Sequence, residues 1–239
     1  MTEAIQKLID SFLAQADTAL GQGYAAVLYG SAARGDYIAG HSDVNLLLLL
    51  DDASPERLRA LAGALKQWTG ARQAPPLLMS RAEWARVTDA FPIEIADMQS
   101  AYRVLRGADP LAGITVVRAD LRRALERELR GKLIRLRQAY AGYAGDTRAL
   151  ATLARGSVAT ILLMLRSLLR LLGRPAPNSA RELIPPAAAV VGFPATALTV
   201  VAEHRGDTRW RCDVDTFAAY LDAVERAVRY VDELQLGDQ

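Results

Sequence analysis

The sequence has little of the residue types that cross-link small domains or bind structural zinc. Among 239 residues there is one cysteine, Cys212, and there are two histidines. A single cysteine cannot form an internal disulfide, and a structural zinc ion usually takes four Cys or His ligands. We therefore expect a protein of a reducing compartment, the cytoplasm, whose fold depends on a hydrophobic core.

The sequence also lacks a large excess of basic over acidic residues. Lysine occurs at positions 7, 66 and 132 only, and the 29 basic residues are nearly balanced by 27 acidic ones, for a net charge of +2. This excess is too small to indicate nucleic-acid binding by itself. Nucleic acid is therefore not among the partners that we expect.

The chain lacks an apolar segment that reads as a bilayer span or a signal region. The most apolar helical stretch, residues 158–172, is interrupted by Arg166 and Arg170. It is shorter and more charged than a transmembrane helix requires. Because 51% of the residues are hydrophobic, we expect a soluble, cytoplasmic protein with a sizeable core and no membrane partner.

What the sequence does have is a strand, a Gly-Ser turn and a second strand near its start. An apolar run over residues 24–29 predicts a buried strand that stops at Gly30 and Ser31. A glycine lets the backbone approach a ligand, and a turn leading into a helix presents N–H groups to an anion. The Ser31 hydroxyl and the Arg34 guanidinium add two more donors. The pattern predicts phosphate binding at Gly30, Ser31 and Arg34.

Polar residues open the second strand. Asp43 immediately precedes an apolar run that extends from residue 44 to residue 50. Asn45 is the polar residue near the start of this run. Residues two apart on a strand point to the same face of the sheet. Two oxygen-bearing side chains beside a phosphate site suit a Mg²⁺ ion that bridges protein and nucleotide phosphates.

These residues together carry a resemblance. Gly30-Ser31-x-x-Arg34-Gly35 followed by Ser42-Asp43-Val44-Asn45 resembles the Gly-Ser…Asp-x-Asp motif of the DNA polymerase β-like nucleotidyltransferases. The small bacterial members, antibiotic nucleotidyltransferases and minimal nucleotidyltransferases, are most similar. The resemblance implies an α/β (α+β) domain with a mixed sheet, an NTP substrate, and Mg²⁺ or Mn²⁺ held by acids at both strand positions. This chain has Asn45 in place of the second acid.

The remainder of the first domain is predicted from local patterns. Helical spacing of apolar residues predicts a helix over 2–20, and Ser54-Pro55 predicts a helix start that runs on to Gly70. A short strand is expected at 77–79, and Ser80 with Glu83 forms a capping box. Alternating residues over 93–98 predict another strand.

Glu94, on this last strand, is the candidate third carboxylate. The resemblance implies a third acid on a neighbouring strand, which would share a metal with Asp43 or act as general base. Asp97 is the fallback for the same role. The alternative is an exposed acid on a half-exposed sheet, which is a common arrangement.

Asp109-Pro110 marks a turn, where we place a domain boundary between 1–110 and 111–239. Strand patterns nearly vanish from Ile114 onward. Helices are expected over 121–140 and 147–172, in a short segment capped by Asn178 and broken at Pro185-Pro186, over 194–204, and after Asp213 or Asp215. They predict an all-α antiparallel bundle, which resembles in pattern the helical domain of antibiotic nucleotidyltransferases.

A basic cluster lies on the first helix of this bundle. Its arginines are interleaved with Glu126 and Glu128, which indicates a solvated face with ion pairs between turns. The other interpretation is that Arg130 and Lys132 bind the triphosphate or an anionic substrate.

Two functions follow from the sequence. The first is metal-dependent transfer of a nucleoside monophosphate from an NTP to a hydroxyl of a small molecule or protein, with Asp43, Asn45 and Glu94 as catalytic and metal-binding residues. The second is a catalytically degenerate nucleotide-binding or regulatory protein, whose bundle serves a homodimer or a partner. Asn45 separates them, because a neutral amide binds a divalent cation more weakly than a carboxylate does.

Overall fold

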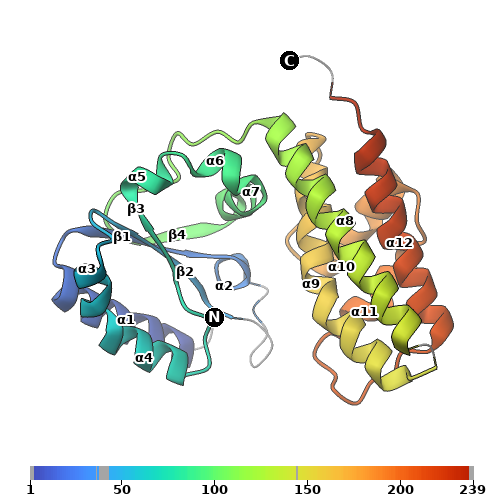
Figure 1. The fold of residues 1–239 in the computed structure, drawn as a ribbon, viewed down its shortest axis with the longest axis horizontal. Coiled ribbons are helices and arrows are strands. Elements are labelled where there is room, and N and C mark those ends of the chain that lie inside the picture. Colours follow the sequence, from blue (N-terminus) through green and yellow to red (C-terminus); the bar gives the residue numbers. More distant parts are fainter. Residues whose placement is uncertain (1–2, 36, 38–42, 144, 237–239) are drawn as a thin grey trace. The chain divides into compact units, whose positions relative to one another are not determined.

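The computed structural model describes residues 3–35, 37, 43–143 and 145–236 (Figure 1). The chain divides into two compact units, Met1–Thr115 and Val116–Gln239. The first unit combines a sheet with helices, and the second is built from helices in its described part. Each unit is presented by itself below.

The first unit is built on a four-stranded sheet with the order β3-β2-β1-β4. β1 is antiparallel to both β2 and β4, whereas β2 is parallel to β3. The predicted mixed sheet is therefore confirmed. The strands are β1 (Tyr24–Tyr29), β2 (Asn45–Leu50), β3 (Leu77–Ser80) and β4 (Tyr102–Arg106).

Helices cover both faces of this sheet. Figure 1 shows α1, α3 and α4 on one face and α5, α6 and α7 on the other, with α2 at the end of β1. The helices of this unit are α1 (Glu3–Leu20), α2 (Ser31–Arg34), α3 (Pro55–Ala60), α4 (Ala62–Gly70), α5 (Arg81–Trp84), α6 (Val87–Ala90) and α7 (Pro92–Ser100).

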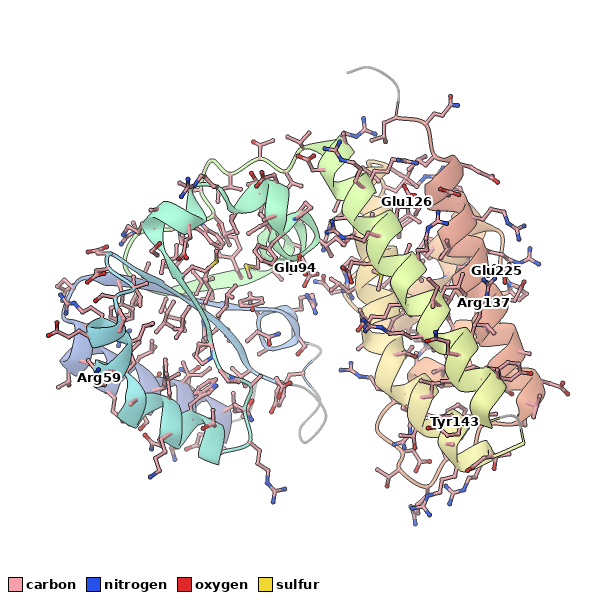
Figure 2. All side chains as sticks on the ribbon, viewed as in Figure 1. Arg59, Glu94, Glu126, Arg137, Tyr143 and Glu225 are labelled. Carbon is pink, nitrogen blue, oxygen red and sulfur yellow. The ribbon has the colours of Figure 1, made fainter. Side chains whose placement is uncertain are left out.

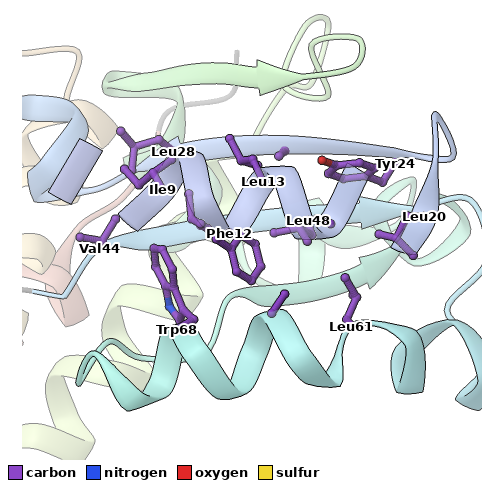
Figure 3. Close-up of a cluster of buried hydrophobic side chains, with 14 of the residues drawn as sticks. Ile9, Phe12, Leu13, Leu20, Tyr24, Leu28, Val44, Leu48, Leu61 and Trp68 are labelled. Carbon is purple, nitrogen blue, oxygen red and sulfur yellow. The ribbon is translucent and has the colours of Figure 1, made fainter. Parts of the chain in front are cut away.

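The core between the sheet and α1 follows from alternation along the strands. Leu46, Leu48 and Leu50 are buried in one cluster with residues of α1 and α4. Figure 3 shows Leu48 in this cluster. Phe12 of α1 packs against Trp68 of α4 with ring centroids 5.1 Å apart. Residues 45, 47 and 49 consequently face the opposite side of the sheet.

The helix predicted from Pro55 to Gly70 is interrupted at Leu61. This residue ends α3 and begins α4, and its N–H donates to the Leu58 carbonyl oxygen, three residues back, at 3.2 Å. Leu61 is fully buried. The tighter turn brings its side chain into the core, which a regular apolar stripe along the sequence does not reveal. The capping box at Ser80 and Glu83 is confirmed.

The strand predicted over residues 93–98 is wrong, because this segment is the helix α7. Ile93, Ile95, Ala96 and Met98 are all buried. A segment buried on several sides shows no helical period in so short a window, and its alternation then imitates a strand. The place beside β1 that a further strand would need is occupied by β4.

The second unit is a helical bundle, as predicted. α9 packs against each of the other four helices described in this unit. They are α8 (Arg118–Tyr143), α9 (Thr147–Leu171), α10 (Ala180–Val191), α11 (Ala195–Glu203) and α12 (Val214–Glu233).

The break predicted at Pro185-Pro186 is wrong, since α10 continues through both prolines. Their neighbours Ile184 and Ala187 are buried, and α10 packs on α9. This packing offsets the backbone hydrogen bonds that the prolines cannot make. The helix is capped by Ser179 rather than Asn178, and the Ser179 hydroxyl accepts a hydrogen bond from the Glu182 N–H at 3.3 Å.

α9 is the one described helix that is long and apolar enough to cross a membrane, judged by length and composition. This test is weak evidence, because the core helix of a soluble protein also passes it. Leu150, Val158 and Leu168 are fully buried within the helical unit.

The core gives a first prediction. We expect Leu48→Ala, at a fully buried position of β2, to lower the free energy of unfolding by about 2–5 kcal/mol, because it removes buried apolar contacts and leaves a cavity. Leu77→Ala is the matched control, since Leu77 lies on β3 and is 40% exposed. Urea denaturation measures both variants, and equal losses would contradict this account of the core.

Candidate functional site

The turn after β1 has the backbone that the Gly-Ser pattern predicts. Gly30 has φ 74° and ψ −150°, a combination that is essentially restricted to glycine. Its carbonyl oxygen accepts the N–H groups of Ala33 and Arg34 at 3.1 and 2.9 Å, which starts α2. Gly35, with φ 91°, ends this helix in the left-handed region. The strand, turn and short helix are thus confirmed.

Asn45 stands directly beside this turn. It is the first residue of β2 and pairs with Tyr29 of β1. A Cβ atom built on Gly30 would lie 2.6 Å from Nδ2 of Asn45. The space that glycine leaves open is therefore filled by the Asn45 amide, so Gly30 is required by a protein side chain whether or not a ligand is bound.

Asp43 lies two residues before β2 and is exposed. Between it and β2, Val44 is buried, and its N–H donates to Oε1 of Gln73 at 2.8 Å. This contact fixes the backbone at the start of the strand. Ser42, which precedes Asp43 in the predicted motif, lies outside the described residues.

The two candidate third acids both lie on α7, one turn apart, in different environments. Glu94 is exposed (Figure 2), whereas Asp97 is 8% exposed. Oδ2 of Asp97 accepts a hydrogen bond from Nη1 of Arg34 at 2.7 Å, and the two side chains are 11% and 10% exposed. The position of Glu94 on a strand was wrong, and its proposed role stays a prediction. Asp97 forms an ion pair with Arg34, which joins α2 to α7.

Tyr29 is a residue of this region that the sequence interpretation missed. Burial, followed by the negative charges of Glu94 and Asp97, raises the pKa of Tyr29 to about 12. The phenol therefore stays protonated at neutral pH. The Arg34–Asp97 ion pair holds α7, which also carries Glu94, beside the short helix that follows β1. In the sequence, the position of Tyr29 immediately before Gly30 is the feature that could have identified Tyr29 as part of this region.

The arginines of α8 form ion pairs within the helical unit. Nη2 of Arg130 lies 3.3 Å from Glu126 and 2.9 Å from Asp232 of α12. Arg137 binds Glu225 of α12 at 2.8 Å (Figure 2). The solvated, ion-paired face is thus observed for Arg130. Lys132 is partly buried on the same helix, and its contact with a nucleotide stays a prediction.

The donor set limits how a divalent cation could bind. Within the described ranges there is no group of three or more His, Cys, Asp or Glu side chains placed to hold a metal ion. Asp43, Asn45 and Glu94 supply two carboxylates and one amide, all hard oxygen donors. Mg²⁺ is commonly held by one or two carboxylates together with substrate phosphates. The residues fit a cation that arrives with a triphosphate, not a preformed protein cage.

Comparison with known proteins identifies the fold. No family model matches the sequence, and no curated protein matches it. Among solved structures, the chain is similar to spectinomycin adenyltransferase AAD(9) from Enterococcus faecialis, determined with ATP and spectinomycin. The TM-score is 0.59 at 10% sequence identity, and the match covers 95% of this chain and 99% of the other. At this identity the similarity shows a shared fold.

The contact between Gly30 and Asn45 leads to a second prediction. The backbone conformation at position 30 would by itself cost an alanine about 1–3 kcal/mol. We expect Gly30→Ala to lower the free energy of unfolding by more than this amount. The added methyl group also meets the Asn45 amide. Thermal melting and urea denaturation measure the loss.

Gly35→Ala separates the two causes, since Gly35 also has positive φ but a Cβ there would meet nothing within 4 Å. It should cost only about 1–2 kcal/mol of backbone strain. In the double variant Gly30→Ala/Asn45→Ala, part of the Gly30→Ala loss should be recovered. Strict additivity of the two single changes would show that the two residues are not in contact.

The Arg34–Asp97 pair gives a third prediction. Arg34→Ala should destabilise the first unit by about 3–5 kcal/mol, because it removes one member of a largely buried ion pair. Combining it with Asp97→Asn should restore part of this loss, since the carboxylate charge is then also gone. A double-mutant cycle from urea denaturation with no coupling between the two positions would contradict this prediction.

Proposed function

We propose that this protein transfers a nucleoside monophosphate from an NTP to a hydroxyl group of a small molecule. One observation carries the proposal: the glycine turn and α2 follow β1 directly beside Asn45, the first residue of β2, in a fold shared with an adenyltransferase whose structure holds ATP and spectinomycin. A protein hydroxyl is the other acceptor that this chemistry would accommodate.

The turn would bind the phosphates. The N–H groups that open α2 and the Ser31 hydroxyl are hydrogen-bond donors at the end of β1. Arg34, on the same short helix, adds a positive charge that Asp97 orients. Donors fixed before the substrate arrives cost little reorganisation when it binds.

The carboxylates would complete the site. A Mg²⁺ or Mn²⁺ ion bound with the NTP would be held by Asp43, with Asn45 as a neutral oxygen donor, and would neutralise charge on the phosphates. Glu94 is exposed on α7, which the Arg34–Asp97 ion pair ties to α2 at the end of β1. It is the base that we assign to the acceptor hydroxyl.

The reaction is an in-line displacement at the α-phosphorus. The acceptor oxygen forms a bond to that phosphorus, the bond to the bridging oxygen breaks, and pyrophosphate leaves. The hydroxyl proton passes to Glu94. Positioning and charge neutralisation supply most of the rate acceleration for this kind of step.

A non-catalytic nucleotide-binding protein is the second candidate. Asn45 favours it, because an amide in this position removes one negative charge from the set of cation ligands. Nucleotide would then bind at the same turn without transfer. The two candidates predict the same binding site and differ in turnover.

Incubation with Mg²⁺, each labelled NTP and a panel of hydroxyl-bearing acceptors, followed by mass analysis, tests the proposal. We expect an acceptor heavier by one nucleoside monophosphate, together with pyrophosphate. Asp43→Asn should reduce the rate by about 100-fold or more, because it removes the carboxylate that would hold the cation against the phosphates.

Asp51→Asn is the matched control. Asp51 follows the far end of β2, where it forms an exposed ion pair with Arg81, so the transfer rate should be unchanged. Nucleotide binding without any transferred product would favour the second candidate. If Asp43→Asn and Asp51→Asn reduced the rate equally, Asp43 would have no special role in the reaction.

A further inference from the structure

Asn45 occupies a position where its amide meets whatever binds at the Gly30 turn. The register of β1 and β2 places it opposite Tyr29, and its Nδ2 atom lies against Gly30. Asn45 is half-buried, so part of its side chain stays accessible beside the turn. A phosphate at this turn would therefore contact the side chain of Asn45.

The chemistry of an amide at this point differs from that of an acid. A primary amide offers two N–H donors and one carbonyl acceptor, whereas a carboxylate at neutral pH only accepts hydrogen bonds. A carboxylate next to a phosphate is repelled unless a cation lies between them. An amide can donate directly to a phosphate oxygen, with or without a cation.

Among the described residues of β2 there is no second carboxylate that stands in for the Asn45 amide. Asp97 is engaged by Arg34 at 2.7 Å, and Glu94, the proposed base, lies on α7 rather than on β2. Three acidic, His or Cys side chains do not come together anywhere in the part of the chain that the structure describes. Asp43 is therefore the acid that the start of β2 contributes.

We propose that Asn45 is a phosphate ligand, which donates an N–H to the triphosphate and lets this site bind an NTP without a divalent cation. This inference rests on the proposed nucleotide site and concerns its binding step. The site accepts the free nucleotide anion as well as its metal complex. A cation then serves the transfer step rather than the binding of the nucleotide.

The test compares ATP affinity by titration calorimetry in EDTA and in excess Mg²⁺, for the wild type and Asn45→Asp. We expect the wild-type affinity to differ by less than about threefold between the two conditions. Asn45→Asp should bind ATP more than about tenfold more weakly in EDTA, and Mg²⁺ should restore its affinity. The melting temperature of each form, with and without Mg²⁺, checks the fold.

Two further variants separate charge from other effects. Asn45→Ala should weaken ATP binding both in EDTA and in Mg²⁺, because it removes the N–H donor without adding charge, and Mg²⁺ should not restore its affinity as it does for Asn45→Asp. Asn178→Asp makes the same chemical change at an exposed position before α10 in the helical unit. It should leave both affinities unchanged.

The outcomes distinguish this inference from the proposed function. A wild type that requires Mg²⁺ as strongly as Asn45→Asp does would overturn the role of Asn45 while preserving the nucleotide site. Equal affinities for all variants in both conditions would show that position 45 does not face the phosphates. If folded wild type and variants bound no NTP under either condition, the proposed nucleotide site itself would be wrong.

Discussion

The antiparallel pairing of β1 with β2 is the constraint on which the first unit depends. In the observed register, Leu46, Leu48 and Leu50 enter the core against α1, and Tyr29 pairs with Asn45. A shift by one residue would turn every leucine to the opposite face. Because all five leucines of β2 are buried, on both faces of the sheet, their burial alone does not select this register. The observed register keeps Asn45 off the face that α1 covers and places its amide against Gly30. The geometry of the candidate site is thus a consequence of how β1 pairs with β2.

The ion pair between Arg34 and Asp97 plays a complementary part on the other side of the turn. It links α2, which carries the proposed phosphate-binding donors, to α7, which carries Glu94. A buried ion pair adds little net stability relative to well-packed apolar residues, because both charges lose their hydration. In this protein the ion pair ties two short helices, α2 and α7, to each other. The guanidinium that the sequence assigns to phosphate is already engaged by a protein carboxylate.

The helical unit distributes its charge differently. Arginines along α8 are paired with acids of the same helix and of α12, such as Glu126, Glu225 and Asp232. Exposed pairs of this kind contribute little to stability but keep a basic helix compatible with its neighbour. The apolar stripe of α9 supplies the core instead. The glycine turn thus belongs to the first unit, and the second unit has a hydrophobic core of its own.

The sequence by itself determined the features that depend on neighbouring residues. Apolar periodicity placed β1, β2, α1 and the long helices, and local hydrogen bonding placed the caps at Ser80 and Asp213. Tertiary structure decided what depends on distant contacts. It made residues 93–98 a helix, because they are buried and β4 takes the place beside β1. It also paired Arg34 with Asp97, 63 residues away in the sequence, and seated Asn45 over Gly30. These contacts join segments that are far apart in the sequence. The local pattern of one segment carries no information about the other, so only the packing of the folded chain brings them together.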